Sequence, residues 1–128
     1  MLDEAAIVEM AGSGLIEFGG HTHHHAILSQ LSDKERYHEI RQSIDTVYEL
    51  TGRPCRYFAY PNGRAEDYNA KTMRDLETCG IQIAVTTIPG PNDRRTPAME
   101  LNRYGVGADL SMAGFQLMVH HFFSILHR

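Results

Sequence analysis

Short runs of β-branched and aromatic residues alternate with helical segments along this sequence, and this alternation is the strongest constraint on its fold. The pattern predicts helices at residues 32–51 and 69–79, and strands at residues 55–60 and 81–86. Parallel strands need a long connecting segment, which is most often a helix. The sequence therefore predicts an α/β fold with a parallel sheet.

The helix at residues 32–51 has the clearest boundaries. Ser32 and Glu35 form a capping box at its start, and Gly52 with Pro54 stops it at the other end. Its apolar residues recur at spacings of three and four, so we expect them to form one buried face. These residues are Tyr37, Ile40, Ile44, Val47 and Tyr48.

The remaining segments carry weaker signals, mainly apolar or helix-forming residues bounded by glycine or proline. They predict a helix at residues 3–10, a buried strand at 15–18, a loop at 89–100, a short strand at 101–106 and a last helix at 111–125. Four side chains of the last helix follow helical spacing, and we expect them in the core or, if that core is left uncovered, on a dimer surface. They are Phe115, Met118, Phe122 and Ile125.

Length and charge exclude several classes of protein. The 128 residues contain no repeats or low-complexity linkers, which predicts one domain over residues 1–128. Twelve Lys and Arg against 16 Asp and Glu give a net charge of −4, which argues against nucleic acid as a partner. No apolar stretch approaches the roughly 20 residues of a membrane span, and the first residues lack the pattern of a secretory signal. Two cysteines are too few for a disulfide scaffold.

Histidine is unusually frequent, because the chain has eight and four of them fall within residues 21–25. His21 and His25 are four residues apart, so both imidazoles could face one divalent ion if the loop turns helically. Two histidines form an incomplete site, since a metal centre normally has a third protein ligand, often a carboxylate. The alternative is a solvent-exposed polar loop that is rich in histidine, and spacing alone leaves both interpretations open.

A second loop, at residues 57–64, combines aromatic residues with a tight turn. Pro61, Asn62 and Gly63 end the predicted strand there. Such a turn exposes backbone N–H groups that can stabilise a developing oxyanion. The alternative is an ordinary type I or type II turn with Pro61 at its second position.

Five sequence blocks, taken in order, are typical of one family. They are EFGGHTHHHAIL from Glu17, EIRQS from Glu39, FAYPNG from Phe58, AVTT from Ala84 and LNR from Leu101. Across nearly the whole chain their order and spacing resemble the polysaccharide deacetylase family (carbohydrate esterase family four). The resemblance implies a distorted β/α barrel of the TIM type and removal of acetyl groups from N-acetylated polysaccharide.

The resemblance also implies roles for individual residues. His21 and His25 match the two metal-binding histidines of the family, and the ion would be divalent, with zinc as the expected identity. The backbone N–H of Asn62 matches the position that contributes to the oxyanion hole. Tyr60 and Pro61 would shape the substrate groove.

The sequence also departs from the family. Thr22 matches a residue that braces the histidine motif, but Ala59 stands where many members carry an arginine that orients the catalytic aspartate. The family's Thr-Phe-Asp-Asp-Gly segment, which supplies the general base and the third metal ligand, has no match, and no catalytic histidine lies upstream. We therefore expect residues 1–128 to be the C-terminal portion of a barrel, completed by a missing N-terminal half or by a second copy in a homo-oligomer.

Other polar residues are candidates to replace the missing groups, although charged loop residues are usually just solvated. The candidate ligands or bases are Glu17, Glu66, Asp67 and Asp93. His120 and His121 lie on the last predicted helix, where the family has no matching histidine.

Two hypotheses about function result. The leading one is a metal-dependent deacetylase-type hydrolase that acts on a carbohydrate polymer and is weakly active or inactive as an isolated chain. The competing one is a non-catalytic carbohydrate-binding or assembly module that kept the fold and two histidines. The sequence leaves localisation open; if the parent protein has a signal peptide, we expect the cell envelope or secretion.

Overall fold

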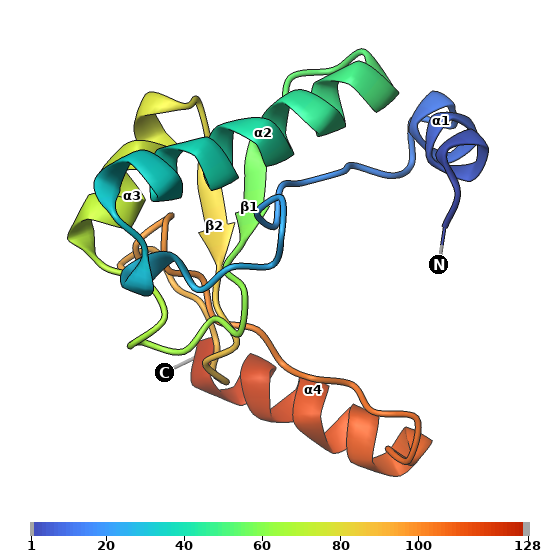
Figure 1. Cartoon of the computed structure of the whole chain (residues 1–128). Helices are drawn as coiled ribbons and strands as arrows, with labels where there is room; N and C mark the ends of the chain where they lie inside the picture. Colours follow the sequence, from blue (N-terminus) through green and yellow to red (C-terminus); the bar gives the residue numbers. More distant parts are fainter. Residues whose placement is uncertain (1, 127–128) are drawn as a thin grey trace.

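The computed structural model describes the backbone of residues 2–126 and the side chains of residues 2–119. Its elements, in chain order, are α1 (Glu4–Gly12), the 3₁₀ turn η1 (Leu28–Gln30), α2 (Asp33–Thr51), β1 (Tyr57–Ala59), α3 (Ala70–Thr78), β2 (Ile83–Val85) and α4 (Met112–Leu126) (Figure 1). Each predicted helix and both central strands are therefore confirmed, with the strands shorter than the sequence indicated.

The sheet is parallel, as predicted. β1 pairs with β2, with Tyr57 opposite Ile83. Single parallel bridges extend it on both sides, from Gly20 to Phe58 and from Val85 to Leu101. α2 lies over the strands and packs against α3 (Figure 1). The described residues thus form a mixed α/β layer around a short parallel sheet, and they do not close a barrel.

The boundaries of α2 are those that the sequence predicts. The Ser32 N–H donates to a carboxylate oxygen of Glu35 at 3.0 Å, the Ser32 Oγ accepts from the Glu35 N–H at 3.4 Å, and Gly52 ends the helix in the left-handed region at φ 66°. These contacts satisfy backbone groups that a helix end leaves unpaired.

The buried face of α2 differs from the prediction. Tyr37 and Tyr48 are 44% and 56% exposed, whereas Arg36, Glu39 and Ser43 are buried. Polar side chains tolerate burial only where they find partners. Arg36 donates to Asp75 of α3 and to Asp33, and Glu39 and Ser43 accept hydrogen bonds from residues 21–24. Apart from Asp33, these partners lie 15 or more residues away in sequence, so apolar spacing could not indicate them.

The core lies between the sheet, α2 and α3. Its largest fully buried side chains include Leu28, Ile40, Phe58, Tyr60 and Leu76. Tyr60 also stacks on Tyr68, with ring centroids 4.1 Å apart and planes 10° from parallel, and its hydroxyl donates to the Met99 carbonyl at 2.8 Å. The core therefore reaches from the helices to the loop that follows β2.

The predicted strand at residues 15–18 is wrong. Leu15 is 87% exposed and Ile16 is 39% exposed, and the chain pairs with β1 only at Gly20. A strand needs a neighbour for its backbone groups, and the apolar run precedes the point of contact. The contact itself requires glycine, because a Cβ at Gly20 would lie 2.8 Å from the Ser43 hydroxyl and 2.9 Å from the Phe58 ring.

The C-terminal predictions are correct only in part. The strand expected at residues 101–106 is reduced to the single bridge at Leu101. α4 begins at Met112 and runs below the carboxyl ends of the strands (Figure 1). Of the two placements expected for Phe115, the core is wrong, since that side chain is 39% exposed, and the dimer surface stays a prediction; Met118 is half-buried. The side chains of Phe122, Ile125, His120 and His121 lie outside the described residues. No helix in the described chain is long and apolar enough to cross a membrane.

Candidate functional site

Two loops leave the carboxyl edge of the sheet side by side. The histidine loop (residues 21–25) follows Gly20, and the Pro-Asn-Gly turn (residues 61–63) follows β1. Gly20 and β1 run parallel, since the Gly20 N–H donates to the Tyr57 carbonyl and the Ala59 N–H donates to the Gly20 carbonyl, each at 2.9 Å. In α/β folds this edge is where working residues usually gather.

The rings of His21 and His25 lie close together, although residues 21–25 do not form the helical turn on which that expectation rested. Their ring centroids are 4.8 Å apart, and the rings meet edge to face at 71°. The Nδ1 of His21 lies 2.7 Å from the Ala59 carbonyl, which assigns the proton to Nδ1 because a carbonyl only accepts. In the neutral imidazole this leaves the lone pair on Nε2, which is the usual arrangement of a metal-binding histidine.

The backbone of the histidine loop is irregular. Thr22 and His25 have φ values of 61° and 58°, in the left-handed region that non-glycine residues rarely adopt. Each such residue costs on the order of 1 kcal/mol or more, so contacts elsewhere must hold the loop. The Oγ1 of Thr22 is buried and has no hydrogen-bond partner among the described residues.

Those contacts come from α2. Glu39 accepts from the backbone N–H groups of His23 and His24 at 3.0 and 2.8 Å, and its other oxygen lies 2.7 Å from the His24 Nδ1. One turn later, the Ser43 Oγ accepts from the His21 N–H at 3.0 Å. Burial raises the pKa of Glu39, but the hydrogen bonds from His24 and His23 outweigh it and hold that pKa below its ordinary value. Glu39 and Ser43 belong to one of the five family blocks, but no role was predicted for either; their four-residue spacing on one helix face is the signal that was available.

The Pro-Asn-Gly turn is held from β2. The Thr87 Oγ1 donates to the Asn62 carbonyl at 2.6 Å, and the Thr87 N–H donates to the Gly63 carbonyl at 2.9 Å. Asn62 has a φ of 57°, and its N–H has no hydrogen-bond partner within the described part of the chain. Asn62 is exposed, and a backbone N–H of this kind can donate a hydrogen bond to an anionic oxygen.

Tyr60 and Pro61 are both buried, although the resemblance implies that they shape a groove. Tyr60 lies beneath the turn, and burial raises the pKa of its hydroxyl well above the ordinary range. Burial and the hydrogen bond to Glu100 likewise raise the pKa of Tyr68 to about 12. The two stacked tyrosines therefore support the turn from below as neutral side chains.

The candidate replacement carboxylates do not join the histidines. Asp67 is buried and accepts from the Arg64 N–H at 2.8 Å, while Asp93 accepts from the backbone of Arg95 at 2.8 Å. Glu17 and Glu66 are exposed. Across the described side chains, no three His, Cys, Asp or Glu residues are placed so that they could hold a metal ion together.

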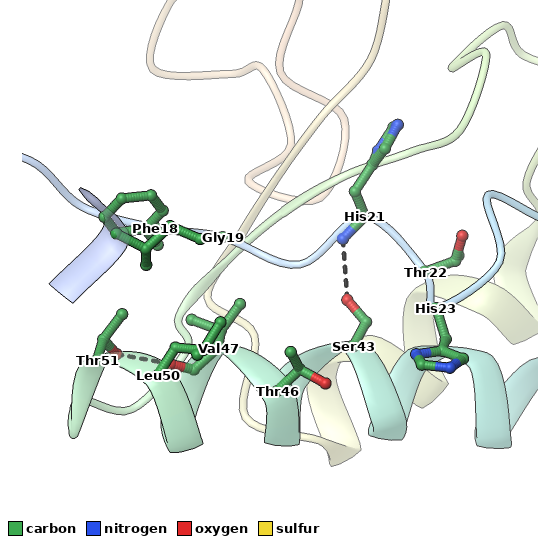
Figure 2. A pocket seen from close by; sticks show the side chains of 11 residues that line it. Phe18, Gly19, His21, Thr22, His23, Ser43, Thr46, Val47, Leu50 and Thr51 are labelled. Carbon is green, nitrogen blue, oxygen red and sulfur yellow. Dashed lines mark hydrogen bonds between the residues drawn. The ribbon is translucent and has the colours of Figure 1, made fainter. Parts of the chain in front are cut away.

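A pocket of about 320 Å³ lies between α1, the chain at residues 18–23 and α2 (Figure 2). Its lining is mostly apolar and includes Phe18, Val47 and Leu50. Figure 2 shows the His21 ring pointing away from α2, although His21 is among the residues that line the pocket.

Comparison with known proteins assigns the part of the chain that contains both loops to one family. The profile of the Polysaccharide deacetylase family matches residues 3–84, more than half of the chain. The chain belongs to the polysaccharide deacetylase family. The matched range includes the histidine loop, α2 and the Pro-Asn-Gly turn.

Individual members of the family give the same result. This deacetylase-family chain is 31% identical over 114 residues to the putative polysaccharide deacetylase YxkH of Bacillus subtilis (strain 168). It superposes on the Streptococcus pyogenes deacetylase PplD in complex with acetate with a TM-score of 0.82, at 25% identity over 91% of the chain. It also shares the fold of a mutant of BA3943, a CE4 family pseudoenzyme, with a TM-score of 0.61 at 12% identity over 94% of the chain.

The matched relatives are much longer than this chain. It spans 39% of the Bacillus protein, 50% of the Streptococcus chain and 47% of the pseudoenzyme chain. The family is thus established from one part of such a protein, and the activity of a whole deacetylase does not follow from membership alone.

Proposed function

We propose that this chain is the part of a metal-dependent polysaccharide deacetylase that supplies two metal ligands and an oxyanion-binding N–H. The observation that carries the proposal is the pairing of His21 and His25, 4.8 Å apart, on the same sheet edge as the Asn62 turn. The reaction would be hydrolysis of the acetamide groups of an N-acetylated carbohydrate polymer.

The histidine pair suits a divalent ion such as zinc. Zinc accepts neutral imidazole nitrogen, and the hydrogen bond from His21 Nδ1 to the Ala59 carbonyl is the second contact that metal-binding histidines usually make. A bound ion would supply Lewis-acid activation of water and carbonyl. A catalytic zinc site normally has three protein ligands, so His21 and His25 form only part of the set.

The residues around the pair would bind and orient the substrate. The N–H of Asn62 is the donor for the oxyanion, because it points from a fixed turn and has no partner among the described residues. The buried side chains of Pro61, within that turn, and of Tyr60, which packs beneath it, would hold the groove wall. None of these groups is a general base, so we expect the chain alone to be weakly active or inactive.

Residues 1–128 are proposed to act as one domain, the C-terminal portion of a TIM-like barrel. The missing ligand and base would come from an N-terminal half or from a second copy of the chain. A homo-oligomer predicts a mass of at least two chains in sedimentation equilibrium at micromolar concentration. A monomeric mass would reject the second copy as the source.

A non-catalytic module is the second candidate. It is favoured by the lack of a third ligand among the described side chains and by the shared fold of the CE4 pseudoenzyme. Such a module would bind N-acetylated carbohydrate without releasing acetate.

Metal binding tests the proposed metal site, and acetate release tests whether the chain is catalytic on its own. We expect isothermal titration to detect about one Zn²⁺ per chain, weakly, and His21→Ala to abolish it, since one imidazole alone is a poor ligand set. The matched control is His38→Ala, which removes an exposed histidine from α2. No Zn²⁺ binding by the parent chain, or equal binding by His21→Ala, would reject the metal site. Acetate release from chitooligosaccharides that vanishes with His25→Ala would show that the chain is a complete enzyme.

A further inference from the structure

Glu39 is a carboxylate that is hydrogen-bonded to the histidine loop through both of its oxygens, although it is not itself a candidate metal ligand. It is 8% exposed on the inner face of α2. Its three hydrogen bonds all come from His23 and His24. A buried carboxylate is costly unless hydrogen bonds compensate for the lost water, and here all the compensation shown comes from the histidine loop.

The position of these contacts within the loop matters. They lie at residues 23 and 24, between the two left-handed residues Thr22 and His25. Neither His23 nor His24 belongs to any regular element, so the carboxylate takes the place of a backbone partner for both N–H groups. Glu39 thereby fixes the part of the backbone that separates the two candidate ligands.

A second contact from α2 completes the arrangement. Ser43 lies four residues after Glu39 and holds the His21 N–H at 3.0 Å. The His21 ring is fixed in turn by the Ala59 carbonyl at 2.7 Å. His21 is therefore anchored independently, whereas the course of the chain from His21 to His25 depends on Glu39.

We propose that Glu39 is a positioning residue that sets the placement of the His25 imidazole relative to His21 through the backbone of residues 23 and 24. The inference rests on the proposed function in one respect, that the two imidazoles bind a divalent ion. Glu39 does not touch that ion; it acts on ligand geometry, as outer contacts of metal sites commonly do.

The first experiment needs no metal. In the metal-free chain we expect nuclear Overhauser contacts between the His21 and His25 rings and slow exchange of the His23 and His24 amide protons. Glu39→Ala should remove the ring contacts and speed exchange at both amides about tenfold or more. The matched control is Glu49→Gln, which changes an exposed carboxylate on the same helix. Ring contacts that persist in Glu39→Ala would overturn the inference.

The second experiment uses Co²⁺ alone as the probe. Glu39→Ala should weaken Co²⁺ binding about 10- to 100-fold and alter the visible absorption of the saturated complex, while Glu49→Gln stays within about twofold. Glu39→Gln keeps the shape and one acceptor but loses the charge, so we expect a smaller loss of about three- to tenfold. If Glu39→Ala does not fold, Glu39→Gln decides, and affinity equal to that of Glu49→Gln contradicts the inference.

The two experiments separate this inference from the proposed function. If the parent chain binds no Co²⁺, the proposed metal site fails, and the ring contacts alone decide whether Glu39 positions His25. If the parent binds Co²⁺ and Glu39→Ala binds it equally with an unchanged spectrum, the metal site stands and the role of Glu39 is rejected.

Discussion

The histidine loop and the Pro-Asn-Gly turn leave the same edge of the sheet, but different parts of the fold hold them. Side chains of α2, Glu39 and Ser43, hold the first loop through its N–H groups. The second is held by the backbone and hydroxyl of Thr87, next to β2, and it packs on the core through Tyr60. The first loop therefore depends on a few polar side chains, and the second on close backbone packing.

This difference predicts that substitutions in the Pro-Asn-Gly turn cost the most stability. A Cβ at Gly63 would lie 2.9 Å from the Thr87 nitrogen, and Gly63 has a φ of 74°. We expect Gly63→Ala to lower the free energy of unfolding by about 3 kcal/mol, from left-handed strain and a clash that backbone cannot relieve. Urea denaturation measures the change.

Gly80 provides the matched control for that measurement. Its φ is 90°, but a Cβ there would meet nothing within 4 Å. Gly80→Ala should therefore cost only the left-handed strain, about 1 kcal/mol. Equal losses for Gly63→Ala and Gly80→Ala would show that close packing against Thr87 does not hold the turn.

The same contrast explains how much the sequence could predict. The helix at residues 33–51 follows from local signals, because its capping box and its terminal glycine are encoded within a few residues. The two loops follow from motifs, and the structure places them on one edge. Glu39 and Ser43 were missed because their partners are 15 to 22 residues away and because a polar residue on a helix is normally assigned to solvent. Only the folded loop makes a buried carboxylate stable at that position.

The strand at residues 15–18 failed for a related reason. Its apolar residues satisfy the pattern of a buried strand, but burial depends on what lies next to the chain, and Leu15 is 87% exposed. The apolar pattern implies a packing partner for this segment, and the described residues do not provide one. The exposed apolar segment is consistent with our proposal that another half or another copy covers it.

The second prediction uses pH to distinguish the Glu39 contacts that hold the histidine loop from the tyrosine packing that holds the Pro-Asn-Gly turn. The pKa of Glu39 lies below its ordinary value of 4.5, so its stabilising contribution is present above that value and is lost as pH falls through the lower, folded pKa. The pKa of Tyr68 is raised from 10.0 to about 12, so its contribution is complete below pH 10 and is lost as pH rises toward 12. In amide spectra recorded across pH, residues 21–25 should respond at the acid limit and residues 61–63 at the alkaline limit. Glu39→Gln should alter only the acid transition of residues 21–25, and Tyr68→Phe should alter only the alkaline transition of residues 61–63. A single transition shared by both loops would contradict the view that they are held separately.

The smallest predicted effects come from deleting one hydroxyl that holds each loop, that of Ser43 at the histidine loop and that of Thr87 at the Pro-Asn-Gly turn. Ser43 is buried, and Ser43→Ala leaves the part-buried His21 N–H without its acceptor, so we expect a cost of about 1–2 kcal/mol. Thr87 is exposed, and Thr87→Val keeps the shape and the backbone bond to Gly63, so we expect about 0.5 kcal/mol. Urea denaturation of the two variants gives the order directly. We expect Ser43→Ala to be the more destabilising, because the hydrogen bond between Ser43 and His21 is part-buried, whereas the one between Thr87 and Asn62 is exposed and water can replace the Thr87 hydroxyl. The reverse order would mean that the histidine loop holds its shape without α2.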